Sequence, residues 1–188
     1  MDLTREAHEH PAMRGRAELW HSALVLLALG VLLYPLSRFS FLAFHVVAEL
    51  ASIAVAAALF MVAWHARRYH VEPHLLFLAT AYVASAAIDL VHTLAYKGMD
   101  IIPGYDANLP TQLWLAARYL QAVSLVIFPL VIDRPMRLWR LAGGYGLTTL
   151  ALLVLAFMGL LPDAFIEGQG LTAFKVNSEY AVSALLAR

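Results

Sequence analysis

The chain contains no cysteine among its 188 residues. This absence excludes disulfide bonds, thiolate metal sites and a cysteine nucleophile, and it says nothing about the redox compartment. Charged residues are also scarce, at 14% of the chain, and the two signs cancel to a formal net charge of zero. Because nucleic acid is bound by basic surfaces, no nucleic acid partner is expected.

Motifs of catalysis are absent as well. We find no serine-nucleophile elbow, no phosphate-binding loop and no HExxH zinc motif. His8, Glu9 and His10 are spaced too closely for the last of these. The chain is therefore not expected to be an enzyme. Its histidines and carboxylates leave an intramembrane metal-dependent enzyme as one alternative.

Apolar residues are what the sequence has in abundance. They make up 62% of the chain, and the mean hydropathy is +0.71. A soluble domain is typically nearer half apolar and a quarter charged. A membrane-spanning helix needs about 20 largely apolar residues. The sequence therefore predicts an all-α, polytopic membrane bundle, with helices near 19–36, 41–65, 74–96, 111–132, 138–161 and 174–188.

The domain organisation follows from these runs. Residues 1–18 are predicted to form a cytoplasmic arm, and residues 19–188 a membrane-embedded domain. The first helix is predicted to end at Tyr34-Pro35. The last helix is short for a membrane span. We therefore expect the chain to be a fragment whose continuation lies in the cytoplasm.

The basic residues predict the orientation, since Lys and Arg accumulate on the cytoplasmic side of a membrane. With the N-terminus inside, the inner segments hold eight of them and the outer loops three. The eight are Arg5, Arg14, Arg16, Arg67, Arg68, Arg134, Arg137 and Arg140, and the three are Arg38, Lys97 and Lys175. The sequence thus predicts a cytoplasmic N-terminus.

A few ionisable residues interrupt the apolar helices. In membrane helices such groups usually face the bundle interior and mark function. With a rise of 1.5 Å per residue, each lies about 6–12 Å from the outer end of its helix. Four helices thus contribute polar groups at one level of the outer leaflet. These residues are His45, Glu49, Asp89, His92, Arg118 and Glu179.

Their spacing predicts a shared site. His45 and Glu49 are four residues apart, Asp89 and His92 are three apart, and each pair therefore shares one helix face. If the two helices are antiparallel neighbours, the pairs face each other, and Arg118 can neutralise one carboxylate. Further residues predicted to bind the ligand or to complete its hydrogen bonds are Tyr96, Gln112, Tyr119, Lys175 and Glu179.

Several occupants fit this cluster. The first is a divalent metal ion (Zn, Fe or Mn) held by His45, Glu49, Asp89 and His92, since such helices build metal sites in bundles. The second is a small organic ligand or quinone, gripped by His92 and Arg118. The third is haem between His45 and His92. A fourth interpretation is purely structural: buried pairs fix helix register, and the domain is then a membrane anchor or dimerisation module.

Four stretches carry a resemblance to a known family: FHVVAELASIAVAAALFMVAWHARR, DLVHTLAYKGM, NLPTQLWLAARYLQAVSL and GQGLTAFKVNSEY. Together they resemble the third type of membrane-associated sensor domain (the MASE group), which precedes bacterial histidine kinases and diguanylate cyclases. The positions of this chain that match are His45, Glu49, Asp89, His92, Lys97, Gly98, Trp114, Arg118, Tyr119, Lys175 and Glu179.

The resemblance implies a sensory input module of a two-component system or a diguanylate cyclase in the bacterial inner membrane. Any catalytic activity would lie in a C-terminal output domain, which is then absent or truncated in this chain. A ligand-driven movement would pass through the last helix to a cytoplasmic kinase or cyclase in the same polypeptide. Such output domains also imply a homodimer in the lipid bilayer. The resemblance does not choose among metal, cofactor and organic ligand.

Overall fold

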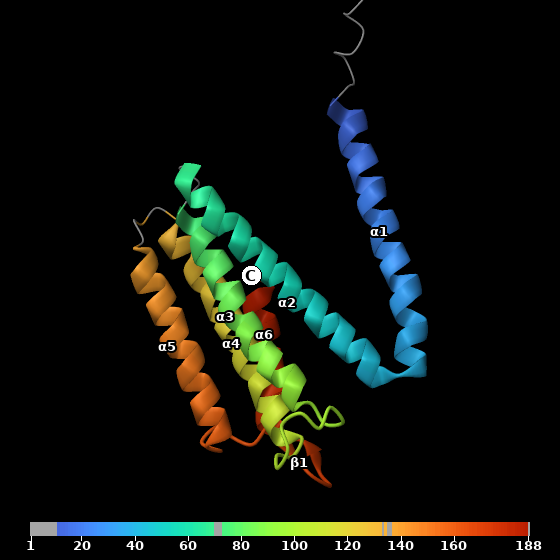
Figure 1. Cartoon of the computed structure of the whole chain (residues 1–188), viewed down its shortest axis with the longest axis vertical. Helices are drawn as coiled ribbons and strands as arrows, with labels where there is room; N and C mark the ends of the chain where they lie inside the picture. Colours follow the sequence, from blue (N-terminus) through green and yellow to red (C-terminus); the bar gives the residue numbers. More distant parts are fainter. Residues whose placement is uncertain (1–10, 70–72, 133, 135–136, 188) are drawn as a thin grey trace, which may run out of the picture. The chain divides into compact units, whose positions relative to one another are not determined.

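The computed structural model describes residues 11–69, 73–132, 134 and 137–187. Within these residues the chain forms six α-helices, as predicted (Figure 1). Five of them are long and apolar enough to cross a membrane, whereas α6 has only 14 residues. The elements are α1 (Pro11–Phe39), α2 (Phe41–Ala66), the short 3-10 helix η1 (Arg67–Tyr69), α3 (Pro73–Ala95), α4 (Asn108–Val131), α5 (Leu138–Phe157), β1 (Phe165–Ile166), β2 (Gly170–Leu171) and α6 (Ala173–Leu186).

The described residues fall into two compact units, one ending at Val46 and the other beginning at Val47. In the first unit α1 continues through Pro35 to Phe39, beyond its predicted end. Proline is tolerated in membrane helices where nearby groups satisfy the freed backbone. The Ser37 hydroxyl near this proline donates to the Tyr34 carbonyl over 2.7 Å, whereas the carbonyl that would have accepted from residue 35 belongs to Val31. The helix also starts at Pro11, so it includes part of the predicted arm; residues 1–10 lie outside the described residues.

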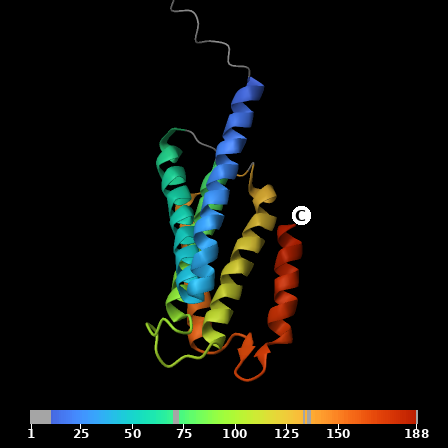
Figure 2. The same ribbon diagram turned by 90° about the vertical axis from the view of Figure 1, so that its right-hand side faces the viewer.

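The core of the second unit lies between α3 and α4. Ile88 from α3 packs against Leu113 and Ala117 from α4, and all three are fully buried. The Ser85 hydroxyl donates to the Ala117 carbonyl over 3.1 Å, which adds a polar link between the two backbones. Helix α4 also contacts α5 and α6, and Figure 2 shows α6 beside it. It is therefore the element through which α3 and α6 are connected.

Two helix ends show how local chemistry sets the boundaries. Gly98, just after α3, has φ 103°, a positive angle that is typical of a helix stop and that glycine adopts at little cost. Helix α5 was predicted to reach residue 161 but ends at Phe157. Gly159 there has φ 66°, and the N–H of Leu160 donates back to the Leu155 carbonyl over 2.9 Å. That bond caps the helix, so its last carbonyls need no further turn.

The segment before α6 forms a two-stranded antiparallel hairpin, in which Phe165 pairs with Leu171. The sequence analysis did not predict this hairpin. It is fastened to the start of α4 by Asn108, whose side-chain oxygen accepts from the N–H groups of Ala164 (2.8 Å) and Phe165 (3.0 Å). The base of α6, which directly follows the hairpin in Figure 2, is thereby fixed to α4.

Helices differ greatly in how far they are buried. In an apolar stretch of 18 residues, half of the residues of α3 are buried, against 6% in α2 and 6% in α5. Large apolar side chains such as Val55, Val62, Leu147 and Leu150 are exposed on those two helices. Contiguous exposed apolar surface of this size marks contact with another apolar phase. These faces therefore contact the lipid bilayer.

Candidate functional site

The candidate site starts from Glu49 on α2 and His92 on α3. A carboxylate oxygen of Glu49 and a ring nitrogen of His92 lie within 4.8 Å of each other. His92 is buried, with 4% of its surface exposed, and Glu49 is half-buried. A buried imidazole thus faces a carboxylate from a neighbouring helix.

The ring of His92 is held in one orientation. Its Nδ1 lies 2.7 Å from the backbone carbonyl oxygen of Pro110. A carbonyl only accepts, so Nδ1 carries the proton and donates it. In the neutral ring the lone pair is then on Nε2, the tautomer that metal-binding histidines usually adopt. Tyr96 packs its ring edge against His92, with ring centroids 6.1 Å apart.

His45 precedes Glu49 by one turn of the same helix, as predicted. Its ring stacks on Phe41, with the centroids 6.1 Å apart and the planes at 16°. Residues four apart on a helix share a face. Because α2 is continuous, His45 and Glu49 lie on one helix face, as predicted. The role of His45 as a ligand stays a prediction.

Asp89 lies one turn before His92 on α3 and forms an ion pair with Arg118 on α4. Only one of its carboxylate oxygens is used: among the described residues nothing hydrogen-bonds to Oδ1, which is buried. Glu49 and His92 both lie within electrostatic range of this carboxylate. An unsatisfied buried oxygen costs free energy, so Oδ1 is well suited to accept a ligand.

A small cavity of about 100 Å³ lies beside this ion pair. At about 30 Å³ per water molecule, it has room for roughly three waters or a few ligand atoms. Polar groups from three helices line it together with Asp89 and Arg118. These groups belong to Ser52, Tyr82, Ser85 and Gln121.

Lys175 and Glu179 form a second polar cluster where α6 meets α4. The two side chains pair with each other, and Lys175 is buried. The Lys175 ammonium lies 3.9 Å from the centre of the Trp114 ring, and the Arg118 guanidinium lies 6.0 Å from it. Arg118 and Glu179 line a common cavity of about 450 Å³ between α4 and α6. Arg118 therefore borders both polar clusters.

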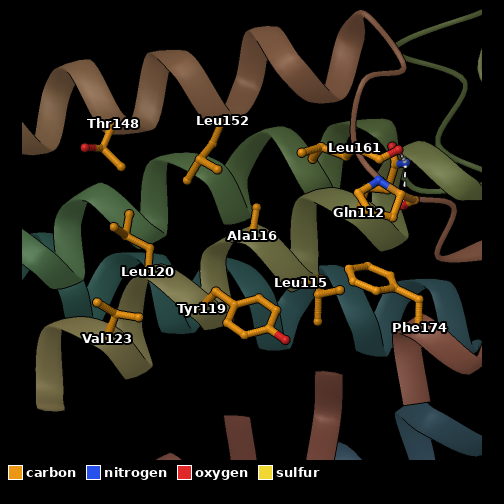
Figure 3. A pocket seen from close by; sticks show the side chains of 11 residues that line it. Gln112, Leu115, Ala116, Tyr119, Leu120, Val123, Thr148, Leu152, Leu161 and Phe174 are labelled. Carbon is orange, nitrogen blue, oxygen red and sulfur yellow. Dashed lines mark hydrogen bonds between the residues drawn. The ribbon is translucent and has the colours of Figure 1, made fainter. Parts of the chain in front are cut away.

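Gln112 and Tyr119 lie elsewhere, around an apolar cavity of about 300 Å³ between α4, α5 and the start of α6. Gln112 donates from Nε2 to the carbonyls of Leu161 and Pro162, both over 3.0 Å, and closes one end (Figure 3). The ring of Tyr119 extends along the cavity wall. The predicted set is thus distributed over three neighbouring places rather than one.

The donors around Glu49, Asp89 and His92 are nitrogen and carboxylate oxygen, which suit Zn²⁺ and other first-row divalent ions. Two atoms that each lie about 2.1 Å from one ion are at most about 4.2 Å apart. The Glu49 and His92 atoms lie within 4.8 Å of each other. Small side-chain rotations therefore suffice to bring both onto one ion, with Asp89 Oδ1 available as a further oxygen.

Two parts of this arrangement escaped the sequence analysis. The Pro110 carbonyl is a backbone group, so no residue type indicates it; α4 also begins at Asn108, three residues earlier than predicted, because proline is tolerated in a first helical turn. Trp114 was noted only as a family-like position. Its spacing of four from Arg118 on one helix face is the signal that could have identified its role.

Comparisons with known proteins place the whole site in one domain. Residues 36–188 match the family model MASE3, described as a membrane-associated sensor domain, and every predicted site residue lies within this match. No curated protein and no solved structure matches the chain. The matched segment is a sensor domain and not a catalytic one. With its apolar helices and its buried His/carboxylate cluster, the chain belongs to the MASE3 family of membrane-associated sensor domains.

Proposed function

We propose that this sensor domain binds a divalent cation, with Zn²⁺ as the best fit, through Glu49, Asp89 and His92. His45, one turn along α2 from Glu49, is proposed as a further ligand. The observation that carries the proposal is the His92 ring, whose Nδ1–H bond to the Pro110 carbonyl leaves the lone pair on Nε2. An outer hydrogen bond of this kind orients most metal-binding histidines.

The burial of Asp89 supports the same proposal. A charged group inside a membrane protein is costly and is usually retained for function. Arg118 satisfies one carboxylate oxygen of Asp89, and among the described residues nothing hydrogen-bonds to the other, Oδ1. Glu49 adds a second negative charge close by. This excess of anionic oxygen favours a cation over an anionic or neutral occupant.

In the proposed signalling role, the N-terminus is cytoplasmic and the domain lies in the bacterial inner membrane. Cation binding changes the position of α6, which leads to a cytoplasmic kinase or cyclase in the same polypeptide, and the domain works as a homodimer. The positive-inside pattern supports the orientation. The family assignment supports the sensory role. A cation can drive such a change only if it binds one helix arrangement better than another.

The test is zinc binding by the purified chain in detergent, measured by elemental analysis and calorimetry. The parent protein should carry His8→Ala and His10→Ala, which remove two histidines outside the proposed site. His92→Ala and Glu49→Gln should each weaken zinc binding by about 100-fold or more, since losing even an outer partner costs 10–100-fold. His74→Ala, at the other end of α3, is the matched control. Equal affinity of His92→Ala and the parent would contradict the proposal.

A second candidate is an apolar organic ligand such as a quinone tail, and the cavity around Tyr119 favours it. Its volume of about 300 Å³ is at the lower end for small-molecule sites, and its walls are almost wholly apolar. Mass spectrometry of an organic extract should then find a compound that is lost in Ala116→Phe, which fills the cavity. An extract with membrane lipids alone would rule this candidate out. A Soret band in the absorption spectrum would instead indicate haem.

A further inference from the structure

We propose that Arg118 couples the cation site to α6 by changing its anionic partner from Asp89 to Glu179. The inference rests on the proposed cation site and adds how its occupation reaches the last helix. In the structure Arg118 pairs with Asp89 on α3. Its other side borders the cavity that also contains Glu179 of α6.

The path follows from the packing. Helix α6 packs on α4, and α4 packs on α3. The start of α6 is fixed to α4 through the Asn108 hydrogen bonds to the hairpin segment, so the rest of α6 is the part able to move. Arg118 lies on α4 between the two polar clusters and lines the cavity beside each of them. A charge change at Asp89 therefore reaches α6 through one side chain.

A cation beside Glu49 and His92 alters the electrostatics of that side chain. It attracts the Asp89 carboxylate, through the oxygen that has no hydrogen-bond donor among the described residues, and it repels the Arg118 guanidinium. A buried charge that loses its partner is strongly unfavourable, so Arg118 must find another anion. Glu179 lines the same cavity and is that anion.

The second polar cluster would change when Arg118 approaches Glu179. Glu179 pairs with Lys175, whose ammonium lies over the Trp114 ring at 3.9 Å. When Arg118 approaches Glu179, two cations share one carboxylate beside one indole. The Lys175–Glu179 pair then loosens, and α6 shifts relative to Trp114. Coupling between two sites must be reciprocal, so a change at Glu179 must alter cation affinity.

The experiment measures zinc affinity of the full chain carrying Glu179→Gln, in the His8→Ala, His10→Ala background. Glu179 is no part of the cation site, yet its loss should weaken zinc binding by about 5- to 150-fold, the usual range for coupled sites. Glu167→Gln makes the same substitution in an exposed pair and should leave zinc affinity unchanged. In an Arg118→Gln background, Glu179→Gln should have no effect, because the coupling residue is gone.

Trp114 gives a second readout that does not depend on an Arg118 variant folding. Phenylalanine at Trp20, Trp64 and Trp139 leaves Trp114 as the single tryptophan. Its emission should change with added Zn²⁺ and saturate together with binding, and Glu179→Gln should abolish the change. Zinc binding with unchanged Trp114 emission, or with unchanged affinity in Glu179→Gln, would overturn the coupling and leave the cation site standing. A parent protein that binds no zinc would overturn both.

Discussion

Among the described residues, two ion pairs that join different elements of the second unit lie in opposite surroundings. Asp89 and Arg118 join α3 to α4 with side chains 5% and 25% exposed, inside the apolar spans. Lys97 and Glu167 join the loop after α3 to the hairpin, with side chains 71% and 60% exposed. Water can replace either partner of the second pair but not of the first.

The comparison explains why only the buried pair is a sensible place for a sensor. In the exposed pair solvent screens any change of charge, and nothing else in the protein responds. In the buried pair a new charge nearby leaves a group without compensation, and the surrounding helices must adjust. The cost of burying Asp89 and Arg118 would therefore also make them responsive to the proposed cation.

The largest expected loss of stability follows from replacing one partner of the buried Asp89–Arg118 pair. Asp89→Asn leaves the Arg118 charge uncompensated and should lower the free energy of unfolding by about 3–5 kcal/mol. Unfolding in detergent, followed by circular dichroism, measures the loss. The double replacement Asp89→Leu with Arg118→Met removes both charges and should recover most of it. If the single replacement proved no worse than Glu167→Gln, the contrast between the pairs would be wrong.

Breaking a neutral hydrogen-bonded link should lower the free energy of unfolding by an amount between the effects at the two ion pairs. Gln112→Ala removes the hydrogen bonds to the Leu161 and Pro162 carbonyls, which join α4 to the segment after α5. Losing these two hydrogen bonds from the buried Gln112 side chain should cost about 1–3 kcal/mol in the free energy of unfolding. The same unfolding experiment measures it, with Asn177→Ala on the exposed face of α6 as control. A loss equal to that of Asp89→Asn would show that charge adds nothing at these positions.

The smallest effect is expected at the exposed pair. The hydrogen bond and charge of Lys97 lower the pKa of Glu167, and Glu167 in turn raises the pKa of Lys97. The Glu167 contribution is thus present above its unfolded pKa and disappears as pH falls through the folded pKa. The Lys97 contribution is present below its unfolded pKa and disappears as pH rises through the folded pKa. Between these limits Glu167→Gln should change stability by no measurable amount, because the pair is solvated.

A titration of Glu167 by ¹³C NMR checks the direction of the pKa shift. The carboxylate should titrate below an ordinary glutamate, and the shift should shrink in high salt, which screens exposed charges. A Glu167 pKa at or above the ordinary value would mean that the pair with Lys97 does not persist in solution.

The sequence was sufficient for the helices and for the residues that interrupt them. Long apolar runs predicted the six helices, and the unusual placement of Asp89 and His92 within them marked the polar cluster. The stop at Gly98 was also readable, since glycine alone adopts positive φ at little cost.

The sequence did not predict that the polar residues are distributed over three neighbouring places. Arg118 and Tyr119 are adjacent, yet a helix turns about 100° per residue, so they enter different cavities. Depth along a helix was predicted, but the face that each neighbour covers depends on packing between helices. The Pro110 carbonyl that orients His92 is a backbone atom and carries no sequence signal. These are the tertiary features on which the proposed chemistry depends.

In the proposed site His92 and Glu49 bind one cation together. Zinc-edge X-ray absorption of the zinc-loaded chain identifies the atoms around the metal ion. In the His8→Ala, His10→Ala background the spectrum should show imidazole nitrogen and carboxylate oxygen at about 2.0–2.2 Å from zinc. The imidazole contribution should decrease in His92→Ala and stay unchanged in His74→Ala. A zinc shell of oxygen alone, or one unaffected by His92→Ala, would contradict the account.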